Sequence, residues 1–299
     1  MKKDKDKIVI LSITYLLGAL VTLNAYAAPS HLADCILLKP LGNVPSNIYN
    51  VTDVAPAEGI EPFTKDLTAY GLRLVGQDKV SDDFMRLVGR TIVEIFPQDE
   101  KLDLAKQQEV LGIHYRYRAF IPIPVDGDFS YEEENPEQFE ALVRNNSICD
   151  VIMQGNAPQG QVMEVIEHIL HFVTDIGLHY AYPDAWGINA DSSLAISMQK
   201  AIDAGYYKVA KYDDEFEDQE VAHRVKMQEF AYWFITTAWN LQAPYGPIEE
   251  DEWTIRNAAE LRQKLPEMYA VFNDTVGRIM IPPSMEILRE IGPLRNKTQ

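Results

Sequence analysis

The sequence predicts an α+β fold, with a small mixed N-terminal part that holds a short sheet and a predominantly helical C-terminal part. From about residue 160 onward, apolar side chains recur at the three- and four-residue spacing of buried helix faces. Residues 113–125 instead alternate apolar and polar side chains, as a half-buried strand does. We expect a mixed part over 28–150 and a helical part over 151–299, or one continuous domain over 28–299.

The N-terminal part contains two predicted helices and one predicted strand. Ser81 is a favourable N-cap, and the apolar residues that follow it repeat at helical spacing until Pro97 ends the helix. A second helix is expected over 100–111, before Gly112. The strand covers 113–125. The remaining predictions for this part are a loop with one short strand over residues 28–66 and a solvated loop over residues 126–138.

The C-terminal part is predicted to be a series of helices. Their apolar residues recur at helical spacing, and Pro266 is expected to break or kink the fourth of them. The predicted helices cover residues 161–179, 192–208, 215–241, 256–272 and 284–290.

The first 27 residues are typical of a secretory signal peptide. A charged segment over 2–7 precedes an apolar run over 8–23, and Ala25 and Ala27 form an A-x-A cleavage pattern. The apolar run is shorter than the roughly 20 residues that span a bilayer, although an uncleaved anchor is the alternative interpretation. We therefore expect an exported protein, periplasmic or extracellular, with no integral membrane segment after signal cleavage.

The net charge bears on the kind of partner that the protein can bind, and the cysteine content bears on whether it contains a disulfide. The chain carries 45 acidic and 27 basic side chains, a net charge of −18, whereas nucleic-acid binding needs a surplus of Lys and Arg. We expect no nucleic-acid partner. The two cysteines, Cys35 and Cys149, are expected to form a disulfide in an oxidising compartment. Two separate buried thiols are the alternative.

The segment over residues 164–179 carries the clearest chemical signal. It holds three of the six histidines of the chain. On a helix, its imidazole and carboxylate side chains fall within an arc of roughly 120°. Such side chains are the ligands of Zn²⁺ where thiolates are not used. The polar face of an ordinary surface helix is the alternative interpretation. The side chains on this face are Glu164, Glu167, His168, His171, Asp175 and His179.

A second helix also bears on the chemistry. It is the predicted helix over 215–241, which over residues 228–239 is apolar around most of its circumference, as a buried helix is. Glu229 lies within it, where an unpaired carboxylate would be costly. A metal ion or a cationic partner would offset that cost. The alternative is a solvent-facing Glu229 near Arg224 or Lys226.

These two helices resemble those of zincin metallopeptidases related to the catalytic domain of anthrax lethal factor. In that family, a helix with H-E-x-x-H is followed later by a helix reading roughly E-[FY]-x-A-E. The segment over 61–76 and the helix opening at 79–82 resemble the same region of secreted bacterial members. The resemblance therefore covers residues 60–241, and it implies a zincin-like C-terminal part.

Matching the motifs position by position implies roles for five residues. Glu167 takes the place of the first metal-binding His, His168 that of the general-base Glu, and His171 that of the second metal-binding His. Glu229 matches the downstream metal-binding Glu. Tyr212 falls near the tyrosine that supports the oxyanion. The motif departs from the family because its first two positions are exchanged, so that it reads E-H-x-x-H.

The exchange leaves three chemical outcomes open. Glu167, His171 and Glu229 can bind zinc with His168 as general base. Alternatively, His168 and His171 bind the ion and Glu164 or Glu167 acts as base. In the third outcome hydrolysis is lost. The alternative metal ligands on the same helix are Glu164, His168, Asp175 and His179.

The function expected from the sequence is that of a secreted zinc-dependent hydrolase, metallopeptidase-like, acting on a peptide or protein. The bound ion would polarise the scissile carbonyl and lower the pKa of its water. A catalytically inactive zincin-like protein that acts as a binding module is the alternative. The third hypothesis is an unrelated exported protein with an amphipathic, His-bearing helix.

Overall fold

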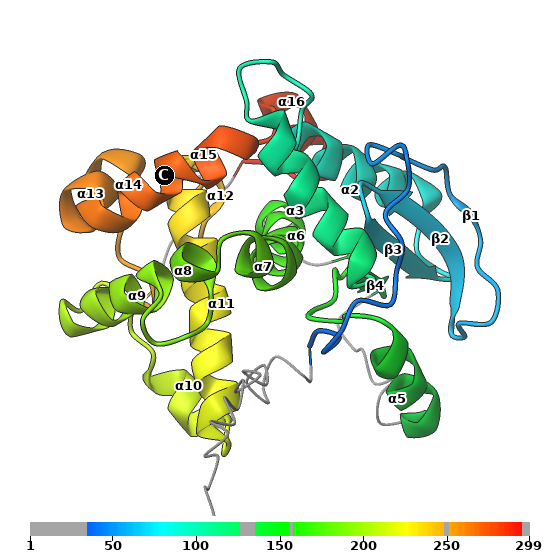
Figure 1. The fold of residues 1–299 in the computed structure, drawn as a ribbon, viewed down its shortest axis with the longest axis horizontal. Helices are drawn as coiled ribbons and strands as arrows, with labels where there is room; N and C mark the ends of the chain where they lie inside the picture. Colours follow the sequence, from blue (N-terminus) through cyan, green and yellow to red (C-terminus); the bar gives the residue numbers. More distant parts are fainter. Residues whose placement is uncertain (1–34, 126–134, 156–157, 159, 248–250, 295–299) are drawn as a thin grey trace, which may run out of the picture.

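The fold is α+β, as the sequence predicts, with a small sheet in the N-terminal half and helices through most of the C-terminal half (Figure 1). The computed structural model describes residues 35–125, 135–155, 158, 160–247 and 251–294. The predicted signal peptide lies outside these residues. Among the described residues, no helix is both long enough and apolar enough to cross a membrane.

The sheet contains four strands in the order β1-β2-β3-β4. Strands β1, β2 and β3 pair antiparallel, whereas β4 pairs parallel with β3. Tyr70 and Gly71 form the two-residue turn between β2 and β3, and both have positive φ angles, 52° and 89°. Two positive φ angles are typical of a type I′ hairpin turn, which Gly71 adopts without strain. The strands are β1 (Ala55–Pro56), β2 (Phe63–Ala69), β3 (Leu72–Gln77) and β4 (Phe120–Ile123).

Two helices connect β3 to β4, because parallel neighbours need a crossover. Helix α2 (Asp82–Ile95) begins where predicted, with the Ser81 hydroxyl accepting a hydrogen bond from the backbone N–H of Phe84. Helix α3 (Leu104–Arg116) starts later than predicted and continues through Gly112. The sequence does not predict the β2–β3 hairpin, because the loop expected over 28–66 extends into β2 and the rest of the hairpin follows it.

The predicted strand over 113–125 is wrong for most of its length. Residues 113–116 complete α3, and only residues 120–123 form β4. Ile113 and His114 are buried together with Val110, which is a helical spacing that outweighs the local alternation of apolar and polar residues.

After α5 (Pro136–Asn145), the chain returns along the outer edge of β4. The backbone N–H of Phe120 donates to Ser147, and the N–H groups of Ile152 and Gln154 donate to Pro122 and Pro124. These bonds hold residues 147–154 against β4. The loop predicted over 126–138 lies mostly outside the described residues, and its last residues belong to α5.

Each of the five predicted C-terminal helices overlaps a helix of the structure, which also contains short helices that were not predicted. The helix expected over 192–208 ends at Asp203, before Gly205, whose φ is positive. The helix expected over 256–272 is broken before Pro266, as predicted. The helices of the described residues from Pro183 onward are α8 (Pro183–Trp186), α9 (Ser193–Asp203), α10 (Ala210–Glu215), α11 (Gln219–Ala238), α12 (Gln242–Tyr245), α13 (Ala258–Lys264), α14 (Pro266–Asp274), α15 (Val276–Ile279) and α16 (Met285–Ile291).

The predicted helix over 161–179 is the centre of the molecule. It consists of α6 (Gln161–Phe172), a π-helical segment η1 (Val173–Leu178) and α7 (His179–Ala181). In Figure 1 this helix lies between the part that contains the sheet and α3 and the part that contains α11. Its apolar residues are fully buried, in a core that also includes side chains of the sheet and of α11. Its polar face is half-buried, apart from His171, which is fully buried.

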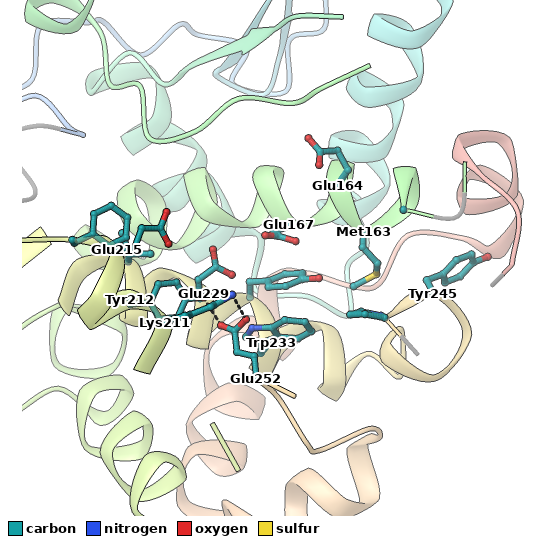
Figure 2. A pocket seen from close by; sticks show the side chains of 15 residues that line it. Met163, Glu164, Glu167, Lys211, Tyr212, Glu215, Glu229, Trp233, Tyr245 and Glu252 are labelled. Atoms are coloured by element: carbon teal, nitrogen blue, oxygen red, sulfur yellow. Dashed lines mark hydrogen bonds and ion pairs between the residues drawn. The ribbon is translucent and has the colours of Figure 1, made fainter. Parts of the chain in front are cut away.

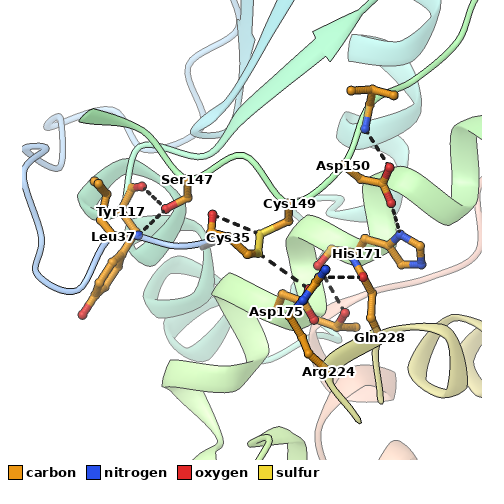
Figure 3. The surroundings of a disulfide bond; sticks show 12 residues. Cys35, Leu37, Tyr117, Ser147, Cys149, Asp150, His171, Asp175, Arg224 and Gln228 are labelled. Atoms are coloured by element: carbon orange, nitrogen blue, oxygen red, sulfur yellow. Dashed lines mark hydrogen bonds and ion pairs between the residues drawn. A yellow bond between two sulfur atoms is a disulfide. The ribbon is translucent and has the colours of Figure 1, made fainter. Parts of the chain in front are cut away.

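The predicted disulfide between Cys35 and Cys149 is present, with a Cα–Cα distance of 4.6 Å. It joins the first described residue to the segment that runs beside β4 and faces the central helix (Figure 3). The bond therefore holds residues 149 and 150 beside the central helix. In the chain-entropy model, closing a loop of this length contributes about 4–5 kcal/mol.

Gly177 of η1 allows the central helix to approach α3 closely. A Cβ atom at this position would lie 2.7 Å from Nε2 of His114 and 2.9 Å from Cγ1 of Val110. His114 is completely buried, so its ring has little space into which to move. We expect Gly177→Ala to lower the free energy of unfolding by about 1–3 kcal/mol, measured by urea denaturation.

Gly277→Ala, in α15, is the matched control. Its added Cβ would meet no atom closer than 3.5 Å, which is ordinary van der Waals contact. We expect this variant to be neutral or slightly stabilised. Equal stability of the two variants would contradict the close packing of η1 on α3.

Candidate metal centre

Two helices bring three of the predicted ligands together. Helices α6 and α11 pack against each other, and Glu167 and His171 on α6 meet Glu229 on α11. One potential ligand atom from each of these residues lies within 4.8 Å of the other two. Figure 2 shows Glu167 and Glu229 extending toward each other from the two helices. This is the juxtaposition that a shared ion requires.

The His171 ring is fixed by Asp150 on one side and faces the carboxylates on the other. Its Nδ1 lies 2.7 Å from Oδ2 of Asp150 (Figure 3), and its Nε2 lies 3.7 Å from Oε1 of Glu229. The ring is 1% exposed, and Nε2 has no hydrogen-bond partner among the described residues. A carboxylate on one ring nitrogen, which fixes the tautomer and leaves the other nitrogen free, is the usual arrangement of a metal-binding histidine.

A second group of potential ligands, Asp150, His168 and His171, shares the same imidazole. Two ligand atoms bound at 2.0–2.1 Å to one tetrahedral zinc ion lie roughly 3.3 Å apart. The 2.7 Å contact between His171 and Asp150 is a direct hydrogen bond and is too short for two ligands of one ion. The 3.7 Å separation between His171 and Glu229 is close to the required value. The group with Glu167, His171 and Glu229 therefore fits zinc better.

His168 lies behind this group. Its Nδ1 is 3.2 Å from Oε1 of Glu164, its Nε2 is 3.6 Å from Oδ1 of Asp150, and it does not line the adjoining cleft. Burial alone lowers the pKa of His168, but the charges of Asp150, Glu164 and Glu167 outweigh burial and raise it to about 10. At neutral pH the ring is therefore a cation between carboxylates.

Burial governs the protonation of the three grouped residues. It lowers the pKa of the His171 imidazole, which favours the neutral form that binds metals. It also raises the pKa of Glu167 to about 7 and the pKa of Glu229 well above its ordinary value, and the charges of neighbouring carboxylates add to both rises. Two ionised carboxylates in this position need a cation.

Asp150 belongs to the site although the sequence did not predict it. Burial opposes its ionisation, but His168 and His171 outweigh burial and hold the pKa of its carboxyl near 2. It follows Cys149 directly, so the disulfide holds its backbone beside the central helix. The one sequence signal that bears on it is this neighbouring cysteine, which does not reveal where the carboxylate points.

A cleft of about 450 Å³ opens over Glu167 and Glu229 (Figure 2). The predicted Tyr212 lies in its wall, and its hydroxyl donates a hydrogen bond to Glu252. Lys211 also contacts Glu252, at 2.6 Å. Glu252 is only 7% exposed and was not predicted, because it follows a run of acidic residues that is typical of a solvated loop. The charged side chains that line the cleft are therefore carboxylates and one lysine, and the rest of the lining is mostly aromatic and apolar.

The remaining predicted ligands lie apart from the group. Asp175 contacts the disulfide, at 3.9 Å from Sγ of Cys35, and Arg224, also at 3.9 Å. His179 packs edge-on against Tyr180 and lines a separate small cavity. Glu164 lines the cleft but accepts a hydrogen bond from the backbone N–H of Met153 and pairs with His168. The described residues thus bring together Glu167, His171 and Glu229, and they separate Asp175 and His179 from them.

Comparison of the chain with known protein families, with characterised proteins and with solved structures finds no match. The chemistry of the site must therefore be inferred from its own residues.

The raised pKa of Glu167 predicts how the stability of the metal-free protein depends on pH. Between about pH 4.5 and 7, the folded protein binds a proton at Glu167 that the unfolded chain has released. The free energy of unfolding therefore falls as the pH rises through this window. We expect Glu167→Gln to be more stable than the unsubstituted protein at pH 8 by about 1–3 kcal/mol, and equally stable at pH 4.

Urea denaturation of the chelator-treated proteins at several pH values measures this difference. Glu215→Gln is the matched control, because Glu215 lines the same cleft but is exposed to solvent. If Glu167→Gln and Glu215→Gln both follow the pH profile of the unsubstituted protein, the raised pKa of Glu167 is contradicted.

Proposed function

We propose that this protein is a zinc-dependent hydrolase of metallopeptidase type, with Glu167, His171 and Glu229 as the metal ligands. The observation that carries the proposal is the buried Nε2 of His171, which has no hydrogen-bond partner among the described residues and faces Glu229 at 3.7 Å. A bound Zn²⁺ would neutralise the two carboxylates, polarise a carbonyl group and lower the pKa of a water molecule.

The residues around the ligands have distinct tasks in this proposal. Asp150 orients His171 through Nδ1 and keeps Nε2 unprotonated. Tyr232 holds Glu167 through a side-chain hydrogen bond. The cleft beside Glu167 and Glu229 admits the substrate. The peptidase assignment rests on the resemblance of residues 60–241 to the lethal factor-type zincins, and the disulfide is compatible with export to the periplasm or the exterior.

A binding module without hydrolytic activity is the second candidate, and the position of His168 favours it. The resemblance assigns the general base to this residue, yet it lies outside the cleft and holds a proton at neutral pH. A hydrolase of this type then needs a carboxylate of the cleft as its base, whereas a binding module needs none.

The ligand set predicts the metal content of purified variants. We expect the unsubstituted protein to bind zinc stoichiometrically and His171→Ala and Glu229→Gln to lose it, because each variant removes one ligand. His179→Ala is the matched control, since it removes an imidazole from the same helix but outside the group, and it should keep its zinc. Elemental analysis measures the metal. Full zinc content in both ligand variants would disprove the proposed site.

Turnover separates the two candidate functions. If the protein is a hydrolase, it should cleave casein or a peptide library, lose this activity with a chelator and regain it with Zn²⁺. Glu229→Gln should be inactive, while His168→Gln should keep part of the activity because His168 is outside the cleft. Stoichiometric zinc without any turnover would instead identify the binding module.

A further inference from the structure

The wall of the cleft contains a buried hydrogen-bond donor that the proposed mechanism does not use. Trp233 is 5% exposed, and its indole Nε1 has no hydrogen-bond partner among the described residues. The indoles of Trp186 and Trp253 differ from it, because they donate to Thr275 and Thr237 at 2.8 and 2.9 Å. An unsatisfied buried donor costs about 1–3 kcal/mol, which an incoming acceptor would recover.

The position of Trp233 places this donor beside the proposed metal ligands. It follows Glu229 by four residues on α11, so both side chains project from the same face of the helix into the cleft. In Figure 2 the nitrogen-bearing side of its ring is directed toward Glu229 and Glu252. Tyr245, the other wall residue whose polar atom lacks a partner, directs its hydroxyl to the opposite end of the cleft.

The residue that the resemblance assigns to oxyanion support is already engaged. The hydroxyl of Tyr212 donates to Glu252, and Lys211 contacts the same carboxylate. The indole of Trp233 is therefore the buried donor that is left for a ligand at this end of the cleft.

The chemistry of the group defines what it can receive. An indole N–H only donates, so its partner must be an acceptor. The carboxylate of Glu252, toward which the indole nitrogen is directed, disfavours an anionic acceptor at this end of the cleft. A cation has no acceptor to offer. A neutral carbonyl oxygen, as in a peptide backbone, satisfies both conditions.

We propose that the indole N–H of Trp233 donates a hydrogen bond to a backbone carbonyl of a peptide bound in the cleft. Trp233 is then a substrate-binding residue that determines how the peptide lies relative to Glu167 and Glu229. This inference rests on the proposed function, since it assumes that the cleft binds a peptide beside the metal.

The indole signals of the zinc-loaded protein, labelled with ¹⁵N, test this contact. The chain has four tryptophans, and Trp233→Phe removes and so assigns one signal. The probe is a peptide hydroxamate, which supplies a zinc-chelating group and backbone carbonyls together. We expect the Trp233 signal to shift downfield on titration. An unchanged signal in the presence of saturating probe would overturn the inference.

Affinity measurements on variants give the second readout. Trp233→Phe keeps an aromatic ring but loses the donor, and it should bind the peptide hydroxamate about three- to tenfold more weakly with unchanged zinc content. Trp239→Phe, at the C-cap of the same helix and outside the cleft wall, should bind it normally. Acetohydroxamate, which has no peptide backbone, should not distinguish Trp233→Phe from the unsubstituted protein.

The outcomes separate this inference from the proposal on which it rests. If the unsubstituted protein binds no zinc, the proposed function is wrong. If zinc and the probe bind but Trp233→Phe has unchanged affinity, only the role of Trp233 is wrong.

Discussion

The packing of α6 against α11 is the constraint on which the site depends. It places the polar face of the central helix, which would be solvated on an ordinary surface helix, against a second buried helix. Three side chains from positions 167, 171 and 229 then share one small region with ligand atoms within 4.8 Å. Without a cation, burial and neighbouring carboxylates raise the pKa of both carboxyl groups, so that ionising the two together is unfavourable. The fold maintains an arrangement that is costly in the metal-free protein.

The orientation of the His171 imidazole determines which of its ring nitrogens faces the other two ligands. Asp150 holds one ring nitrogen, and the disulfide holds Asp150 beside the helix through Cys149. The free nitrogen therefore faces Glu229 and the cleft, away from Asp150. A second cluster of acidic and imidazole groups lies on the other side, where the cationic His168 sits between Asp150 and Glu164. Behind the site, acidic side chains thus have an imidazolium cation between them, whereas among the described residues no protein cation stands between Glu167 and Glu229 in the group in front of it.

Sequence patterns correctly predicted the elements whose ends are determined by neighbouring residues in the chain. Ser81 and Pro97 bound α2 because a cap and a helix breaker act within one turn. The alternation over 113–117 was misleading, because burial of Val110, Ile113 and His114 between helices selects the helical period instead. The convergence of Glu167, His171 and Glu229 was anticipated from the resemblance. Asp150 could not be predicted, since its role depends on how residues 147–154 pair with β4.

Crystals of the protein grown with Zn²⁺ test the central claim most directly, through an anomalous difference map recorded at the zinc edge. We expect one strong peak that contacts Nε2 of His171 and the carboxylates of Glu167 and Glu229, with the Asp150–His171 hydrogen bond intact. A peak between Asp150 and His168, or no peak on the central helix, would contradict it.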